Sequence, residues 1–221
     1  MACWSAENAT KAYLNTLKMD QKAKEPAVAE FISALAAGNN AQLMVVACSG
    51  AADSTTLALV TAAHQTGGHV VCIVPGQEEL NASKIVLGIA TSQVQFMVGE
   101  AQELMLLNQA DFVLIDCKLM NHAEILKAVQ GGDGKPNGTL VVGYNAFSCK
   151  GSWWSCGSKT QLLPIGKGLL VTRFGATITS PKYGSRMSKT RSSRWVVKVD
   201  KCTGEEHVYR IRVPQGKVIQ A

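Results

Sequence analysis

The sequence predicts an α/β protein with a doubly wound parallel sheet, followed by a basic β-hairpin. Five short runs, such as residues 42–48, are apolar throughout, which is typical of strands covered on both faces. Helix-like segments separate these runs, as in folds with helices on both faces of a sheet. The charge balance also changes near Gly175. Residues 1–175 have 12 Lys and Arg against 13 Asp and Glu, whereas residues 176–221 have 10 against 3.

Two helices are expected before the first strand. Ser5 suits the cap of a helix over residues 5–19, and Pro26 suits the first turn of a helix over residues 25–37. The strand at residues 42–48 then leads through a loop into a helix over residues 53–64, which Gly67 and Gly68 close.

The alternation continues along the chain. We expect strands at 69–74, 94–98, 111–116 and 139–144, and helices at 77–89, 100–107 and 119–130. Residues 162–174 are expected to be extended, with a break at residues 166–168. Ligands of doubly wound sheets bind at the carboxyl ends of the strands, so these ends should hold the functional site.

The charge boundary divides the chain into a domain over residues 1–175 and an extension over residues 176–221. Within the extension, residues 195–199 and 207–213 alternate polar and apolar around a turn, which predicts a hairpin. The basic residues before it could bind an acidic partner, or form a solvated loop: Lys182, Arg186, Lys189, Arg191 and Arg194.

The composition indicates a folded protein, because 47% of the residues are hydrophobic and 17% charged. No apolar run approaches the ~20 residues of a membrane helix, so no membrane partner is expected. The start of the chain lacks a secretory signal pattern, and the seven cysteines contain no C-x-x-C pair. We therefore expect a cytoplasmic protein, with the nucleus as the alternative.

The loop after the first strand, residues 49–56, joins a strand to a helix N-terminus, where free amides favour anionic ligands. The alternative is a plain turn in which Ser49 or Asp53 caps the helix. The loop resembles the S-G-G-x-D-S loop of ATP pyrophosphatases, although Ala51 replaces its second glycine.

A second resemblance covers residues 5–174. The helices at residues 5–17 and 26–36, the strand–loop–helix at 42–63, Gly99-Glu100-Ala101 and the strand at 111–116 are similar to class I S-adenosylmethionine-dependent methyltransferases. Among these, the small plant O-methyltransferases that act on caffeoyl-coenzyme A are the most similar group. The opening residues 3–14 and the basic C-terminal hairpin resemble a plant family labelled methyltransferase-like, whose function is unknown.

This resemblance implies S-adenosylmethionine as the cofactor. The residues implied to bind it are Ser49, Gly50, Asp53, Ser54, Gly99, Glu100 and Ala101. The chain departs from the family's cofactor-binding pattern at four positions. Cys48 and Ala52 stand where glycines are expected, Val46 stands at the acidic position of the first loop, and Val74 replaces the acidic residue that accepts hydrogen bonds from the ribose.

The same resemblance implies Asp116 as the residue that orients the acceptor, helped by Asn145 or by Lys118 as a base. Members of that family hold a divalent metal with a carboxylate at the position of Asp116 and with an Asp-Asn pair after the fifth strand. In this sequence the pair is Tyr144-Asn145. Asp116 and Asn145 alone form a poor shell for a hard cation, so we expect no metal.

Two functions follow from these observations. The first is methyl transfer to a small aromatic or acyl substrate, with Trp153 and Trp154 either lining its pocket or packing their loop. The second is a repurposed domain that keeps the fold for binding. The sequence leaves the oligomeric state open.

Overall fold

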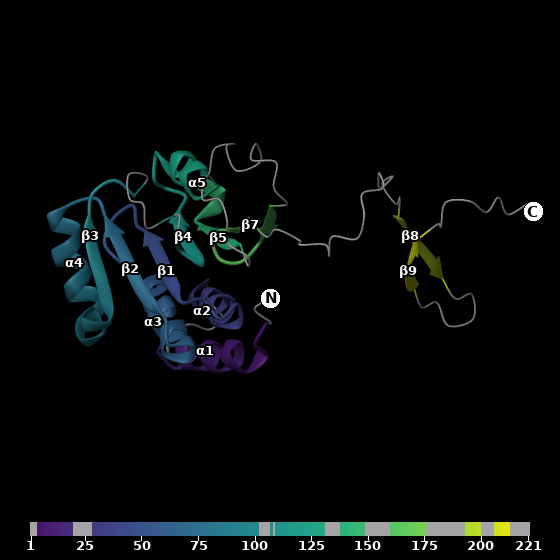
Figure 1. Cartoon of the computed structure of the whole chain (residues 1–221), viewed down its shortest axis with the longest axis horizontal. Helices are drawn as coiled ribbons and strands as arrows, with labels where there is room; N and C mark the ends of the chain where they lie inside the picture. Colours follow the sequence, from purple (N-terminus) through teal and green to yellow (C-terminus); the bar gives the residue numbers. More distant parts are fainter. Residues whose placement is uncertain are drawn as a thin grey trace, which may run out of the picture. The chain divides into compact units, whose positions relative to one another are not determined.

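The computed structural model describes residues 4–19, 28–101, 107, 109–130, 138–148 and 160–175, and the backbone of residues 193–199 and 206–212. The chain divides into two compact units, Met1–Ile178 and Thr179–Ala221, each of which is considered by itself (Figure 1).

The first unit is built on a seven-stranded sheet with the order β3-β2-β1-β4-β5-β7-β6. Its strands are β1 (Leu43–Ala47), β2 (His69–Val74), β3 (Val94–Val98), β4 (Phe112–Asp116), β5 (Thr139–Tyr144), β6 (Gln161–Leu163) and β7 (Leu169–Phe174). The order reverses direction between β1 and β4, which is the switch point where doubly wound folds bind their ligands.

The first five strands are parallel, whereas β7 runs antiparallel to β5 and β6 runs antiparallel to β7. The prediction of a parallel sheet is therefore confirmed for β1–β5. The segment predicted to be extended over residues 162–174, with a break at residues 166–168, forms β6 and β7. Gly166 and Gly168 in the short connection between these two strands adopt φ values of 57° and 83°. A turn of this length can join only antiparallel neighbours, because a parallel crossover needs about a dozen residues.

Helices cover both faces of the sheet, as predicted. The helices are α1 (Ala6–Met19), α2 (Val28–Gly38), α3 (Ser54–Thr66), α4 (Gln77–Leu87) and α5 (His122–Gln130), with short 3₁₀ helices at Gly88–Gln93 (η1) and Ala146–Ser148 (η4). Buried residues of α2, α3 and α4 form one core cluster with one face of the sheet, and those of α5 form a second cluster with the other. α1 packs on α2 and α3.

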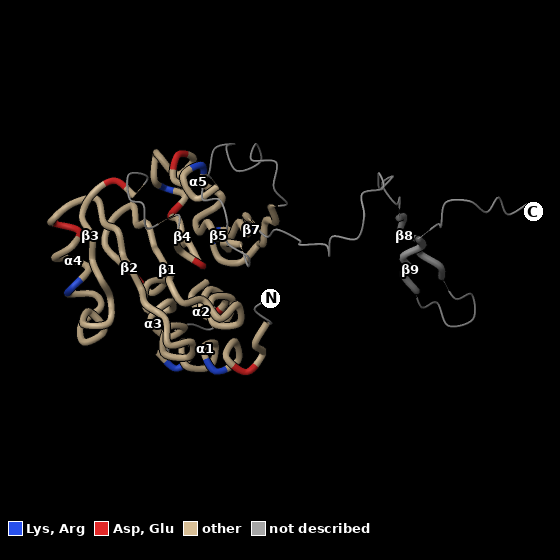
Figure 2. The backbone as a smooth tube through the Cα atoms, in the orientation of Figure 1, with Lys and Arg blue, Asp and Glu red and all other residues tan. Residues whose placement is uncertain are grey.

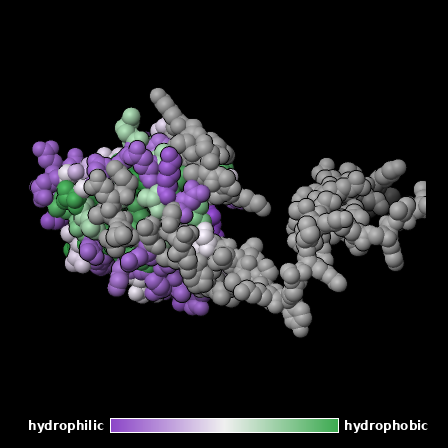
Figure 3. All heavy atoms as spheres, turned by 45° about the horizontal axis from the view of Figure 1, so that its top comes forward, coloured by the Kyte–Doolittle hydropathy of each residue, from purple (hydrophilic) through white to green (hydrophobic). Residues whose placement is uncertain are grey.

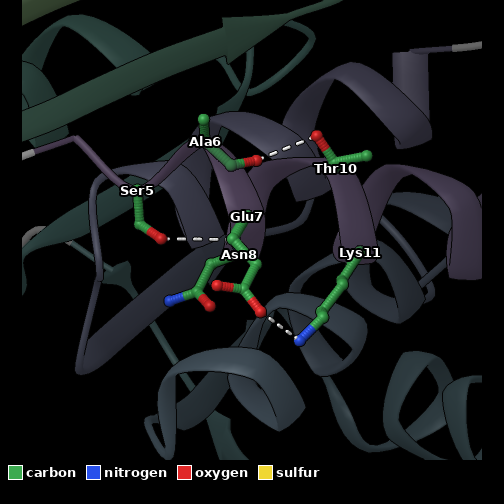
Figure 4. A network of polar contacts seen from close by, with 6 residues as sticks. All are labelled: Ser5, Ala6, Glu7, Asn8, Thr10 and Lys11. Carbon is green, nitrogen blue, oxygen red and sulfur yellow. Dashed lines mark hydrogen bonds and ion pairs between the residues drawn. The ribbon is translucent and has the colours of Figure 1, made fainter.

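Local hydrogen bonds explain where two of these helices begin. Ser5 caps α1, because its Oγ accepts a hydrogen bond of 3.2 Å from the amide of Asn8 (Figure 4). One turn later, Lys11 Nζ and Glu7 Oε1 form an exposed ion pair at 2.6 Å. Asp53 caps α3, and Gly67 ends this helix with a left-handed φ of 72°.

Helix boundaries differ from the predicted ones by a few residues. α4 ends at Leu87, where the chain continues as η1 rather than to residue 89. α5 begins at His122, because residues 117–121 form the turns that leave β4. Of the predicted helix at 100–107, only Glu100, Ala101 and Leu107 lie in the described part of the chain; Glu100 is exposed, and the other two are buried.

The second unit contains the predicted hairpin of β8 (Ser193–Val199) and β9 (Glu206–Arg212), with Ser193 opposite Arg212. The basic residues 182–191 lie outside the described residues. Figure 2 shows how few charged residues the first unit carries along its strands and along α3. Within the described residues, no helix has the length and hydropathy required to cross a bilayer.

Candidate functional site

A cavity of about 380 Å³ lies at the carboxyl ends of β1, β2 and β3. Ala47 and Cys48 line it from the end of β1, and Ile73 and Pro75 line it from the end of β2. The size falls within the range of small-molecule sites, which is roughly 300–1,000 Å³. The cavity therefore occupies the edge of the sheet where a doubly wound fold binds its ligand.

Three predicted cofactor residues form one wall of this cavity: Gly99, Glu100 and Ala101. Gly99 has a φ of 140°, which L side chains rarely adopt, and a Cβ atom built on it would meet no atom within 4 Å. The backbone at Gly99 is therefore accessible, with no side chain of its own and no neighbouring atom close to it. Glu100 is exposed at the rim of the cavity, and its Oε2 accepts a hydrogen bond of 2.6 Å from Asn121 Nδ2.

The other four predicted cofactor residues do not line the cavity. Ser49 donates a hydrogen bond to Asp116, and Gly50 has open space around it. Asp53 accepts hydrogen bonds from the amide and the hydroxyl of Thr55, at 2.9 and 2.6 Å, so it serves as the helix cap. Ser54 is exposed as the first residue of α3.

The loop after β1 is also held in place by contacts with α4 and β2. The amide of Ala52 donates a hydrogen bond of 2.8 Å to Ser83 Oγ of α4. Cys48 is 3% exposed, and its sulfur lies 3.7 Å from that of Cys72. The hydrogen bond with Cys72 and the burial of the thiol raise the pKa of Cys48 well above its usual value. Cys48 is therefore an uncharged packing residue in the wall of the cavity.

No carboxylate from the end of β2 reaches the cavity. Val74, which was predicted to occupy the ribose-binding position, is fully buried in the core cluster on the side of α3. The exposed Pro75 lines the cavity instead. The carboxylate of Glu79 lies against Gly76 at the start of α4, where a Cβ atom on Gly76 would come within 2.6 Å of it.

The predicted catalytic residues meet at the ends of β4 and β5. Asp116 is 5% exposed, and its Oδ1 accepts hydrogen bonds from Asn145 Nδ2 at 2.8 Å and from the amide of Lys118 at 3.0 Å. Its Oδ2 accepts the hydrogen bond from Ser49. These hydrogen bonds satisfy the buried carboxylate of Asp116, because burying a carboxylate without partners would cost free energy of folding. The exposed Lys118 contacts Asp116 through its backbone amide.

Asn145 adopts a left-handed φ of 56°, which Asn tolerates better than most residues. Such a conformation costs energy and is found often at functional sites. Beside it, Tyr144 is buried, and this burial, followed by the nearby Cys48 and Asp116, raises the pKa of its phenol far above the usual value. Tyr144 is therefore a neutral replacement for an acidic residue.

The residues around Asp116 do not fit a divalent cation. Asp116 already accepts three hydrogen bonds, and the amide nitrogen of Asn145 faces it. Hard cations prefer several carboxylate and carbonyl oxygens. In the described part of the chain, no three His, Cys, Asp or Glu residues lie close enough to hold a metal ion.

An adenosyl group fits the cavity at one end only. Gly99 provides bare backbone and Glu100 a hydrogen-bond acceptor, which suit an adenine ring. The ribose end has Pro75 where a carboxylate would accept hydrogen bonds from the ribose hydroxyls.

The cavity wall also contains residues that were not predicted from the sequence, among them Leu119, Met120 and Asn121. These three follow β4 directly, so their position at the carboxyl edge of the sheet was a usable signal. His122, the first residue of α5, is half-buried, with its Nδ1 2.6 Å from the carbonyl oxygen of Leu119. Trp153 and Trp154 lie outside the described residues.

The fold is that of class I S-adenosylmethionine-dependent O-methyltransferases. The chain is similar to a methyltransferase from Geobacter sulfurreducens, with 17% identity over 77% of this chain and 90% of that one and a TM-score of 0.54. A protein from Staphylococcus aureus, proposed to be a caffeoyl-CoA O-methyltransferase, matches with 19% identity over 75% and 99% and a TM-score of 0.54. An O-methyltransferase from Bacillus cereus in complex with SAH matches with 12% identity over 77% and 91% and a TM-score of 0.51.

No curated protein matches the sequence significantly. A family model described as "Protein of unknown function (DUF1442)" matches residues 1–211, which include the α/β unit and all of the hairpin except Arg212. The chain belongs to the DUF1442 family.

Proposed function

We propose that this protein binds S-adenosylmethionine in the cavity at the ends of β1–β3 and transfers its methyl group to an oxygen of a small aromatic or acyl substrate. One observation carries the proposal: in a methyltransferase fold, the wall of Gly99, Glu100 and Ala101 shares one cavity with Leu119, whose amide donates a hydrogen bond of 3.0 Å to the carbonyl oxygen of Asp116. The similar Bacillus cereus enzyme was crystallised with SAH.

Glu100 and Gly99 would hold the adenine end of the cofactor. Glu100 can accept a hydrogen bond from an exocyclic amino group, and the backbone at Gly99 can approach the ring closely. The missing carboxylate at the ribose end weakens binding, because each charge-assisted hydrogen bond contributes about 1.5–3 kcal/mol. Since ~1.4 kcal/mol is a tenfold change, we expect an affinity well below that of a site with the acidic residue.

The cofactor supplies the electrophilic methyl group when it is bound. The residues of the chain orient the acceptor and take its proton. Asn145 and the amide of Lys118 hold Asp116 Oδ1, which leaves Oδ2 to accept a hydrogen bond. A substrate hydroxyl that replaces the Ser49 hydroxyl at Oδ2 would donate its proton there as its oxygen gains the methyl group.

A second candidate is a binding protein that keeps the cavity without catalysis. The observation that favours it is the hydrogen bond between Ser49 and Asp116, which together with the neutral Tyr144 leaves the cluster internally satisfied. Calorimetry and activity measurements separate the two candidates, because the binding protein retains ligand affinity and lacks turnover.

A pyrophosphatase-type nucleotide site has less support from the first loop. A phosphate cradle requires free amides at the helix N-terminus. Here the amide of Ala52 is bonded to Ser83, and the Asp53 carboxylate accepts the amide of Thr55. A negative side chain therefore already occupies the end of α3 where a phosphate would bind.

Isothermal titration with S-adenosylmethionine and with SAH tests the proposed function. Both should bind the wild type, and Glu100→Gln should weaken the binding by about tenfold, since it loses one charged acceptor. Glu124→Gln is the matched control, because Glu124 is exposed on α5 and does not line the cavity. If neither ligand binds at near-millimolar concentration, the cofactor proposal is wrong.

A further inference from the structure

We infer that two copies of this chain associate through β3, the exposed edge strand of the sheet, to form a twofold-symmetric dimer with a continuous sheet. The inference does not depend on the proposed function. β3 is the last strand on its side of the seven-stranded order, so its outer edge pairs with no other strand of the described chain. An edge of this kind presents a row of backbone donors and acceptors.

The two edges of the sheet differ in how they are protected. At the other edge, β6 has only three residues and is followed by Pro164. Short edge strands, charges and prolines are the usual means by which proteins prevent pairing between edges. β3 has five residues, and residues 85–98 contain no Asp, Glu, Lys, Arg or Pro (Figure 2). This edge therefore lacks each of those protections.

Large apolar side chains are exposed at the end of β3 and on the two elements that contact it, α4 and η1. The exposed fractions are 82% for Ile85, 56% for Val86, 96% for Ile89 and 49% for Val98. Hydrophobic atoms are visible among hydrophilic ones on the part of the first unit where α4 lies (Figure 3). A group of exposed apolar side chains beside an unprotected strand edge indicates an interaction surface.

The pattern of β3 favours a second copy as the partner. Val94, Phe96 and Val98 share one face of the strand by alternation, and Val94 and Phe96 pack in the core cluster on the side of α4. Antiparallel pairing about a twofold axis at Phe96 places Val94 opposite Val98 of the second copy, on that same face. Like side chains thus meet like ones, as a twofold interface requires.

Charge gives a second reason for self-association. Residues 85–98 contain no charged side chain, so these residues add no like-charge repulsion between two copies, and the charged residues of α4, Glu78, Glu79 and Lys84, include both signs. Residues 1–175 as a whole are close to neutral, with 12 basic and 13 acidic residues. α4 of each copy would then approach its counterpart, because α4 covers the sheet face beside β3, and Ile85 and Ile89 would be buried between them.

Light scattering coupled to gel filtration tests the inference on the full chain. The wild type should elute with twice the chain mass of 23.5 kDa. The double variant Ile85→Lys/Ile89→Lys should raise the dimer dissociation constant at least about tenfold per substituted isoleucine, because it brings four positive charges into an apolar contact. Leu162→Lys on β6 is the matched control and should remain dimeric, because it lies on the opposite edge.

Both variants replace exposed side chains, and circular dichroism checks that they fold. Hydrogen exchange of the β3 amides adds a readout that needs no variant. Exchange should slow as wild-type concentration rises, because dimerisation pairs the outer edge. A single-chain mass at high micromolar concentration, a double variant that dimerises as tightly as the wild type, dissociation caused by Leu162→Lys, or β3 exchange independent of concentration would each overturn the inference.

Discussion

The hydroxyl of Ser49 donates a hydrogen bond to Asp116 Oδ2, and so joins the loop after β1 to the end of β4. These strands are neighbours in the sheet, although 67 residues separate the two side chains. The bond connects a residue predicted to bind the cofactor with one predicted to orient the substrate. Asp116 is therefore the point where the two halves of the candidate site meet, and substitutions there should report on both.

Asp116→Asn should lower methyl transfer by about 10²–10⁴-fold, because the amide cannot take the proton of the acceptor hydroxyl. The substitution should also cost about 1–3 kcal/mol of unfolding free energy, since an amide hydrogen now faces a donor. Transfer is measured with labelled cofactor and a panel of phenols and acyl acceptors, and stability by urea unfolding.

Asp111→Asn is the matched control for this variant. Asp111 precedes the same strand at its opposite end, where its Oδ2 accepts hydrogen bonds of 3.1 Å from the amides of Gln42 and Leu43. It should lower stability to a similar degree and leave transfer unchanged. Equal loss of transfer in both variants would show that the effect of Asp116→Asn is structural and not catalytic.

Pro75→Glu should strengthen the binding of S-adenosylmethionine by about tenfold or more, because it places a carboxylate in the cavity wall where ribose hydroxyls would lie. Pro75 is exposed, so the substitution buries no charge. The affinity is measured by calorimetry. Gln77→Glu, also exposed but outside the cavity wall, should have no effect. An unchanged affinity in Pro75→Glu would place the ribose elsewhere.

Asp53→Ala should destabilise the protein by about 1 kcal/mol, because it removes the cap of α3 and a favourable charge at the helix N-terminus. Ser54→Ala, at the neighbouring exposed position, should change stability by less than about 0.5 kcal/mol. Neither variant should change the affinity for SAH. A tenfold loss of affinity in Asp53→Ala would instead support the cofactor-binding role predicted from the resemblance.

Stability should fall as the pH rises above about 8.5, the usual pKa of a cysteine thiol. The hydrogen bond with Cys72 and burial raise the pKa of Cys48 in the folded protein, so the folded state keeps a proton that the unfolded chain loses. Stability from this group is thus complete below the unfolded pKa and declines at higher pH by up to ~1.4 kcal/mol per pH unit.

Tyr144 adds to the same trend above about pH 10, since burial raises the pKa of its phenol as well. Urea unfolding at a series of pH values measures the slope. Cys48→Ala should reduce the slope between pH 8.5 and 10, because it removes the first of the two groups. Equal slopes in the wild type and Cys48→Ala would contradict the raised pKa of Cys48.

The sequence was sufficient to predict the elements of the α/β unit, because the signals for them are local. β3 and β5 have the predicted bounds, and α1 begins at the cap that Ser5 provides. Apolar runs bounded by turn residues identify strands whatever their neighbours are. The place of the site at the carboxyl ends of the strands followed from the alternation of strand and helix, since parallel strands end at one edge.

Only the folded chain shows which side chains face each other at that edge. The sequence suggested Val74 for the ribose position, yet the turn after β2 directs Pro75 to the cavity and buries Val74. Ser49 was predicted to bind the cofactor, yet its hydroxyl donates a hydrogen bond to Asp116. Asp116 lies at the end of a strand 67 residues further along the chain. Side-chain direction depends on strand register and loop geometry, which a linear pattern does not contain. The antiparallel direction of β7 likewise follows from pairing between segments distant in the chain.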